Sequence, residues 1–371
     1  MKSRRENRAT EGTGYDVRLL FPVLLLVGLG IVMVYSASSA LALKRFGSDF
    51  YYLKKQALFA GLGICVLVLC RHLPYRLLRP LAYPLLAVTL LLLVAVLVSP
   101  LGLKAGGSTR WLRLGPLSFQ PAELARFALV TYLAYSMSRK QGRIKEFSIG
   151  FLPHVMVLVL LCGLILLQPD FGSAVILTGL TWIMLFAGGV RLSHLASALA
   201  VAAPLLAYVA IQKPYRLQRL MTFTDPWRDP AGDGYQIIHA LMAFGSGQAW
   251  GAGIGQGMQK LFYLPEPHTD FIFAVIGEEL GLIGVAAVLF FYGMIICRGY
   301  GIARGAAEPF GALLATGLTT ALALQICINM AVTLGLLPTK GLTLPFLSYG
   351  GTSLLMSMAS VGVLMNIGAN R

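Results

Sequence analysis

One acidic residue, Asp270, stands where a polar, proline-containing loop meets a strongly apolar run that begins at Phe271. An acid at the mouth of a hydrophobic helix costs free energy to keep there, so such a residue is a functional-site candidate. A side chain at this position can also cap a helix by accepting a hydrogen bond from a free backbone N–H, and Thr269 or Asp270 is suited to that role. Position alone leaves both interpretations open, and a cap does not exclude chemistry.

Two further acids lie at the ends of apolar runs. Glu123 precedes Arg126 by three residues in QPAELAR, which places both on one face of a helix. The pair either forms a salt bridge that makes two intramembrane charges tolerable, or it has a functional role in which it positions a substrate phosphate or tunes Asp270. We favour the functional role because intramembrane charges are usually functional. Asp170, in QPDFGS, is interpreted as the cap of the helix that follows it.

Two more acids, Glu278 and Glu279, lie about two turns into the apolar run that begins at Phe271. We interpret them as internal packing contacts, and we expect Gln325 and Asn329, four residues apart on one helical face, to be their partners.

A second unusual stretch, LPTKGLTLPFLSYGGTSLL, runs from 337 to 355. Its two prolines break a helix, and irregular backbone at membrane depth is tolerated only where it is buried in protein or lines a cavity. Ser348 and Tyr349 offer hydroxyl groups there, although a simple turn between loop and span explains the pattern equally well. The GxGxG spacing in GAGIGQG, from Gly251, lacks the strand and helix that a nucleotide site needs.

The composition indicates a polytopic membrane protein. The chain has 371 residues, of which 57% are hydrophobic and 12% charged, whereas a soluble domain carries about 25% charged residues. The first apolar run follows the basic start MKSRRENR without an evident cleavage site, so we expect it to be retained. The net charge of +15 is spread over short loops, which fits topology and anionic lipids and argues against a nucleic-acid partner. The five cysteines fall within predicted spans and form neither a disulfide framework nor a metal site.

A membrane-spanning helix needs ~20 apolar residues. On that basis the sequence predicts an all-α fold that is a single integral membrane domain over residues 1–371, with residues 1–16 as a tail and 212–270 as a long loop between the seventh and eighth spans. The ten predicted spans are 17–37, 57–70, 82–102, 121–138, 150–168, 172–190, 193–211, 271–297, 310–336 and 345–367.

The distribution of Lys and Arg predicts the orientation. With the N-terminus inside, about 16 basic residues lie on the cytoplasmic side and about 8 in the short outer loops, so both termini are expected inside. Segments 38–56, 103–120, 212–270 and 337–344 then face outside, and the segment 103–119 has the pattern of a small hairpin. Glu123, Asp170 and Asp270 would converge on this outer side.

Several of these motifs resemble the SEDS family of shape, elongation, division and sporulation proteins. The resemblance is carried by YRLQRLMTFTDPWRDPAGDGYQ, KLFYLPEPHTDFIFAVIGEELG and LPTKGLTLPFLSYGGTS, with QPAEL and QPDFGSA in the same order. PEPHTDFIFA and TKGLTLPFLSYGGTS are similar to the division branch more than to the elongation branch. The resemblance implies a ten-span peptidoglycan glycosyltransferase whose essential catalytic acid is Asp270 and whose cavity holds Glu123 and Arg126. Arg126 departs from the family pattern, in which lysine is usual, and the two side chains differ in geometry.

The implied substrate is lipid II, and the implied reaction is attack by a GlcNAc 4-hydroxyl on a lipid-linked MurNAc, with undecaprenyl pyrophosphate leaving. Asp270 would act as general base, and cations would neutralise the leaving group. We expect the substrate-binding residues to be Glu123, Arg126, Arg216, Arg219, Lys260, Thr269, Ser348 and Tyr349. We expect no metal ligands, although a divalent cation, Mg or Mn, remains compatible with the chemistry.

Two other functions stay open: a lipid II flippase, which would also need a polar cavity, and a non-catalytic division scaffold. The resemblance further implies a location in the bacterial plasma (inner) membrane with the active site outside. It also implies a class B penicillin-binding protein, which is a transpeptidase, and other division proteins as partners.

Overall fold

The computed structural model describes residues 14–99, 102–105, 108–115, 117–211, 223–230, 232, 234–261, 263–339 and 341–370. The α-helices are α2 (Val17–Phe46), α3 (Tyr51–His72), α4 (Leu78–Val98), α5 (Pro121–Arg139), α6 (Leu152–Leu167), α7 (Phe171–Ala187), α8 (Leu192–Ile211), α10 (Tyr235–Gly247), α11 (Ile272–Gly305), α12 (Pro309–Thr333) and α13 (Gly351–Ala369). The short helical turns are η1 (Tyr75–Leu77), η2 (Gln141–Arg143), η3 (Phe147–Phe151) and η4 (Pro226–Arg228).

Seven helices of the described residues are long and apolar enough to cross a membrane: Val17–Phe46, Tyr51–His72, Tyr75–Val98, Phe147–Leu167, Ile272–Gly305, Pro309–Thr333 and Gly351–Ala369. The protein is therefore a helical polytopic membrane protein. The other three predicted spans correspond to α5, α7 and α8, and α7 and the stretch Leu192–Ala202 of α8 are shorter apolar helices. The count of ten spans stays a prediction.

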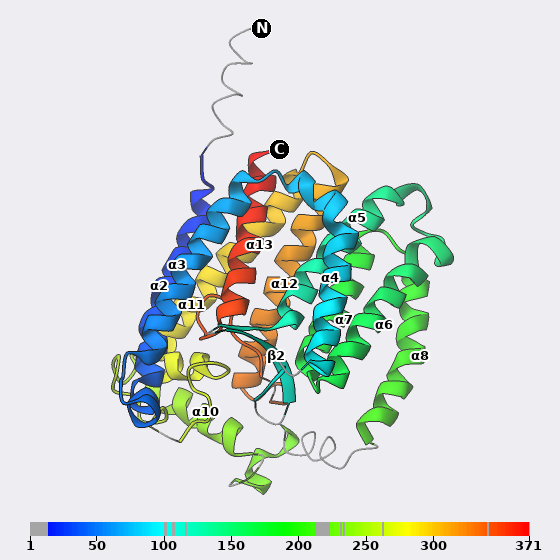
Figure 1. Ribbon diagram of the computed structural model, residues 1–371. Helices are drawn as coiled ribbons and strands as arrows, with labels where there is room; N and C mark the ends of the chain where they lie inside the picture. The colour runs from blue at the N-terminus through cyan, green and yellow to red at the C-terminus, as the bar shows by residue number, and fades with distance from the viewer. Residues whose placement is uncertain are drawn as a thin grey trace.

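The long helices alternate in direction, which brings their ends together in two groups (Figure 1). The start of α2 and the end of α13 lie at one end of the bundle, whereas α10 and the strand β2 lie toward the other. Helices α5, α7, α11 and α13 all begin toward the end that holds α10. The acids at three of these helix starts therefore gather on one side, as the sequence predicted.

The outer helices expose large apolar side chains, as expected for a helical bundle in lipid. Helices α12 and α13 lie at the centre, where α13 packs on α3, α5 and α12. Helices α4 and α6 are peripheral and present leucine, valine and methionine side chains outward, for example Leu91, Met156 and Val159. A water-exposed surface would not retain so many large apolar groups, so these faces are the ones that contact lipid.

A small antiparallel sheet departs from the predicted all-α fold. Its strands β1 (Gly102–Ala105), β2 (Ser108–Leu114) and β3 (Leu117–Phe119) are ordered β1-β2-β3. The hairpin predicted for 103–119 is thus confirmed, with a third strand added. Thr352 ties the sheet to the start of α13, because its hydroxyl donates to the Ser118 carbonyl and accepts from the Gln120 N–H.

The two acids inside the first turns of α11 have different partners from those predicted. Glu278 accepts hydrogen bonds from the backbone N–H groups of Met258 and Gln259. Glu279 accepts from the Gly255 N–H and forms a buried ion pair of 2.6 Å with Lys260. The prediction that Gln325 and Asn329 are their partners is therefore wrong, because both carboxylates face the loop that precedes the helix.

Glycines allow this loop to approach α11 closely. A β-carbon at Gly251, whose φ is 80°, would lie 2.2 Å from the Glu279 carbonyl oxygen, and one at Gly257 would lie 2.7 Å from Oε2 of Glu278. Any side chain at these positions would push the loop away from the helix. The GAGIGQG run is therefore a packing element.

Candidate active site

Asp270 lies just before α11, in the segment that connects the loop to the helix. The N-cap position of α11 belongs to Phe271, and no side chain donates or accepts a cap hydrogen bond there. The hypothesis that Thr269 or Asp270 caps this helix is therefore wrong. Among the described residues, the Asp270 carboxylate makes no hydrogen bond or ion pair, so it is available for a ligand.

The backbone around Asp270 is held by three consecutive contacts. The His268 carbonyl accepts from the Tyr349 N–H at 2.9 Å, and the Thr269 carbonyl accepts from the Ser348 hydroxyl. The Asp270 carbonyl accepts from Nδ2 of Asn329 at 3.0 Å. We call these three hydrogen bonds the carbonyl clamp. Because each carbonyl is fixed from outside the segment, the backbone that carries the Asp270 side chain is held in place.

The clamp explains why the segment around 342–349 is irregular. The Ser348 hydroxyl also accepts the Leu344 N–H at 2.8 Å, and Asn329 also donates to the Leu342 carbonyl. These backbone groups would otherwise be buried without partners, which is costly. Two side chains thus stabilise both the non-helical segment after α12 and the segment that carries the acid.

Gly341 and Arg110 lie beside the Asp270 carboxylate, each on a different segment of the chain. A β-carbon at Gly341 would lie 3.1 Å from Oδ2 of Asp270 and 3.9 Å from Nη1 of Arg110. Arg110, on β2, is anchored through Nη2 to the Pro169 carbonyl. The acid and the guanidinium therefore face each other across Gly341, near enough to interact but not joined in an ion pair.

The surroundings raise the pKa of the Asp270 carboxyl to about 7. Burial is the main cause, because it disfavours the charged form. The negative charges of Glu266 and Asp170 raise the pKa further, whereas the Arg110 guanidinium lowers it. A carboxyl group with a pKa near neutrality is matched to general-base chemistry at physiological pH.

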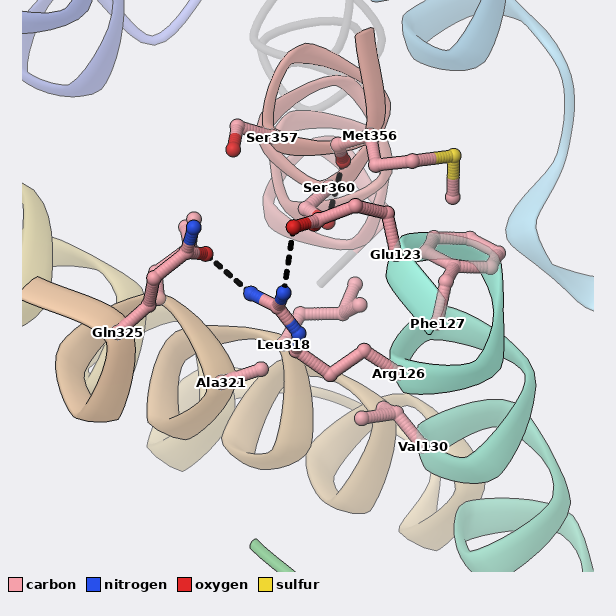
Figure 2. Close-up of a pocket in the computed structure, with 11 residues that line it drawn as sticks. Glu123, Arg126, Phe127, Val130, Leu318, Ala321, Gln325, Met356, Ser357 and Ser360 are labelled. Carbon is pink, nitrogen blue, oxygen red and sulfur yellow. Dashed lines mark hydrogen bonds and ion pairs between the residues drawn. The ribbon is translucent and has the colours of Figure 1, made fainter. Parts of the chain in front are cut away.

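Glu123 and Arg126 form the predicted pair, at 2.7 Å, in a pocket between α5, α12 and α13 (Figure 2). The Gln325 side chain, from α12, contacts the same guanidinium from the other side by accepting a hydrogen bond from Nη1. Ser357 and Ser360, from α13, line the same pocket. Both charges are buried, so the pocket is polar but its cation is already neutralised.

Gln325 connects this pocket to the segment that faces Asp270. Its Nε2 donates to the Thr343 carbonyl at 2.9 Å and lies 3.2 Å from the Ser353 hydroxyl. Thr343 in turn donates to Ser353 at 2.9 Å. This role of Gln325 was not predicted from the sequence, because the contact joins residues that are far apart in the chain.

Asp170 caps α7, as predicted. Its carboxylate accepts from the Ser173 N–H at 3.1 Å and from the Ser173 hydroxyl at 2.8 Å. This use of the side chain leaves Asp170 as a fixed negative charge near Asp270. It contributes to the electrostatics of the site.

The other predicted site residues have mixed outcomes. Lys260 is buried and donates to Glu279 and to the Ser36 hydroxyl, so its ammonium group has partners within the protein. The Thr269 hydroxyl donates to the Glu266 carbonyl, and the Tyr349 ring packs on Tyr52. Arg216 and Arg219 lie outside the described residues.

The described part of the chain offers no group of three or more His, Cys, Asp and Glu side chains that could hold a metal ion. His239 bonds to Gln259, and burial lowers the pKa of the His268 imidazole to about 4.

Comparisons with known proteins agree with this arrangement. The model of the cell cycle protein family of FtsW, RodA and SpoVE matches residues 17–371. The protein named probable peptidoglycan glycosyltransferase FtsW of Trichlorobacter lovleyi is 49% identical over 355 residues, covering 96% of this chain and 93% of that protein.

Two solved structures share the fold. A chain from a structure described as "Structural coordination of polymerization and crosslinking by a peptidoglycan synthase complex" matches with a TM-score of 0.80 at 32% identity, covering 96% of this chain and 98% of that one. The rod shape determining protein RodA of Thermus thermophilus matches with a TM-score of 0.71 at 30% identity, covering 96% and 97%.

Proposed function

The chain belongs to the SEDS family of cell cycle proteins, and from this premise we propose that it is a peptidoglycan glycosyltransferase that polymerises lipid II during cell division. The similarity to proteins named as probable glycosyltransferases supports the reaction class. The observation that carries the mechanism is the Asp270 carboxylate, which is held in place by the carbonyl clamp and has no hydrogen-bond partner among the described residues.

Asp270 is proposed to act as the general base. Its carboxylate takes the proton from the 4-hydroxyl of the acceptor GlcNAc, and the oxygen forms a bond to the anomeric carbon of the donor MurNAc. The bond between that carbon and the pyrophosphate oxygen breaks, and its electron pair leaves with undecaprenyl pyrophosphate. The proton on Asp270 then passes to solvent, which restores the base.

A single carboxylate suffices for this reaction. Enzymes that hydrolyse glycosides use a second carboxylic acid to protonate a poor leaving group. Pyrophosphate leaves without protonation and requires only neutralisation of its charge. The pair of Glu123 and Arg126 and the hydroxyl groups of Thr269 and Tyr349 are proposed to contact the substrate. The Ser348 hydroxyl is assigned to the carbonyl clamp, and Lys260 to the buried ion pair with Glu279.

The proposed setting is the bacterial plasma membrane. The chain would form one domain of ten spans with both termini in the cytoplasm, so that Asp270 faces outward. The synthase complex that shares the fold is described as coordinating polymerisation with crosslinking. We therefore propose a class B penicillin-binding protein, which crosslinks strands, as a partner, together with other division proteins.

Replacing Asp270 by Asn tests the mechanism. Purified Asp270→Asn, together with its transpeptidase, should form no glycan strands from lipid II, while its melting temperature stays within a few degrees of that of the wild-type protein. Asp229→Asn, in a different exposed part of the same long loop, is the control and should polymerise normally. Full polymerisation by Asp270→Asn would overturn the assignment.

An assay with the same proteins reconstituted in vesicles distinguishes a polymerase from a flippase. Movement of labelled lipid II across the bilayer without polymer would support the flippase, and normal division with Asp270→Asn in cells would support the scaffold. Asp270 immediately precedes α11, which begins toward the same end of the bundle as α5 and α7 (Figure 1), and this placement favours chemistry at a surface.

A further inference from the structure

Arg110, on β2, lies beside Asp270 although none of the motifs in the sequence singled it out. Its Nη2 donates to the Pro169 carbonyl, and its Nε has no hydrogen-bond partner among the described residues. Its Nη1 points toward Gly341. One end of the guanidinium is thus anchored, and the other end faces the acid across a glycine.

Gly341 is an exposed residue that lies between Asp270 and Arg110. A β-carbon there would approach both Asp270 and Arg110. Its φ is not in the left-handed region, so the backbone would accept alanine and the absence of a side chain serves to keep the space free. Gly341 therefore has an acid on one side and a cation on the other.

Two of the cations predicted to neutralise the leaving group, Arg126 and Lys260, have partners within the protein. Arg126 is buried between Glu123 and Gln325, and Lys260 is buried against Glu279. A cation already neutralised by a buried carboxylate contributes little further attraction to a phosphate, and separating such a pair is costly. Arg110 has no ion pair among the described residues, so its charge is not neutralised in this way.

The positions of Asp270 and Arg110 suit a displacement that inverts the configuration of the anomeric carbon. In such a reaction the attacking oxygen and the leaving group lie on opposite faces of the sugar, with the base on one side and the group that assists departure on the other. Guanidinium groups bind phosphate oxygens through two parallel N–H bonds. An acid and a guanidinium separated by an exposed glycine have this arrangement.

We propose that Arg110 binds the pyrophosphate of the lipid-linked donor, and that Gly341 leaves the space through which the donor reaches Asp270. This proposal rests on the proposed function and assigns Arg110 a direct contact with substrate. The Pro169 carbonyl holds the guanidinium in the required direction, and the sheet positions the strand that carries it.

The test is direct binding of undecaprenyl pyrophosphate to the purified full-length protein in detergent. Arg110→Ala should weaken binding by about tenfold or more, which corresponds to ~1.4 kcal/mol. Arg113→Ala, an exposed arginine three residues along the same strand, should change binding less than about twofold, as expected for a surface charge. Asp270→Asn should bind at least as tightly as the wild-type protein, because it removes a negative charge near the ligand.

Two further variants separate contact with the ligand from support of the fold. Gly341→Ala should weaken binding while leaving Arg110 and its hydrogen bond to the Pro169 carbonyl intact. Arg110→Lys should bind more tightly than Arg110→Ala and less tightly than the wild-type protein, since lysine keeps the charge but lacks the two parallel N–H groups of a guanidinium. Melting temperatures identify a variant that fails to fold, in which case Gly341→Ala and Arg110→Lys carry the test.

The outcomes distinguish this proposal from the proposed function. If Arg110→Ala and Gly341→Ala bind undecaprenyl pyrophosphate as well as Arg113→Ala does, or if the wild-type protein does not bind it, the role of Arg110 is overturned even where polymerisation is normal. If binding depends on Arg110 and Gly341 but the wild-type protein makes no polymer, the binding site stands and the polymerase function fails.

Discussion

Single residues set the pH dependence of the proposed reaction. Asp270 must be deprotonated to act as a base, and its pKa is raised to about 7. The rate of lipid II polymerisation should therefore rise with pH and level off above neutrality, with a midpoint near 7. His268 is not the source of this transition, because burial lowers its pKa to about 4. Initial rates measured over about pH 5.5 to 8.5 test this expectation.

A neighbouring acid provides the control for that assignment. The charge of Glu266 raises the pKa of Asp270, so Glu266→Gln should lower it. The rising limb of the pH profile should then move to lower pH, and the variant should be faster than the wild-type protein at about pH 6. A profile that does not move, or that moves to higher pH, would contradict the assignment of the limb to Asp270.

The sequence predicted some residues of the site well because their roles depend on local position. Asp170 caps the helix that begins one residue later, and Glu123 pairs with Arg126 within one helical turn. Arg110 and the partners of Lys260 were missed, since these contacts join residues that are distant in the chain. Periodicity carries no information about such contacts.

Among the structural elements, the segment 342–349 is expected to control the position of Asp270. Ser348→Ala removes the hydroxyl that donates to the Thr269 carbonyl and accepts from the Leu344 N–H. It should lower kcat more than it changes KM, and the unsatisfied groups should cost ~1–3 kcal/mol of stability. Ser348→Thr, which keeps the hydroxyl, should recover part of kcat.

Ser138, on α5, provides a matched comparison. Among the described residues its hydroxyl donates to the Tyr135 carbonyl of its own helix, so Ser138→Ala should leave kcat and stability nearly unchanged. If Ser348→Ala raises KM and leaves kcat unchanged, Ser348 contacts the substrate and the clamp does not position the acid.

The buried ion pair of Lys260 and Glu279 fixes the loop before α11. Lys260→Met leaves a buried carboxylate without its cation, which should cost about 3–5 kcal/mol of unfolding free energy. Adding Glu279→Gln should restore part of that loss, because the uncompensated charge is removed. Arg143→Met, which breaks the exposed pair with Glu146, should have little effect in the same detergent melts. Equal effects of Lys260→Met and Arg143→Met would contradict a structural role for the buried pair.

Helices were predictable from the sequence where the length of an apolar run determines the structure. The runs of about twenty apolar residues became helices, and the hairpin pattern became a sheet. The kink at Gly281 inside α11, with φ of 63°, was not predicted. It depends on close contact with the backbone of Ala249 and Gly251, which is again a tertiary property.

At the scale of the whole molecule, the placement of charge relative to the apolar faces determines how the protein lies in the membrane. Arg76, Arg79 and Arg298 form ion pairs with Glu308 and Asp16 near the helix ends on the side of the chain termini. The basic residues of this end favour the cytoplasmic side. Helix α11, which Asp270 precedes, begins toward the opposite end (Figure 1).

Cysteine labelling tests that orientation without reference to activity. In a variant lacking the five natural cysteines, Trp250→Cys places a thiol in the loop after α10, where the native side chain is 83% exposed. Gln141→Cys places one in the exposed turn between α5 and α6. A membrane-impermeant maleimide should label Trp250→Cys on intact spheroplasts, and Gln141→Cys only after the membrane is opened.

The two labels must report opposite sides, because the helices between them cross the bundle an odd number of times in the proposed topology. Labelling of Gln141→Cys alone on intact spheroplasts would place Asp270 in the cytoplasm. Lipid II with its sugars outside would then be unable to reach the base, and the polymerase mechanism would fail regardless of how well Asp270 is positioned.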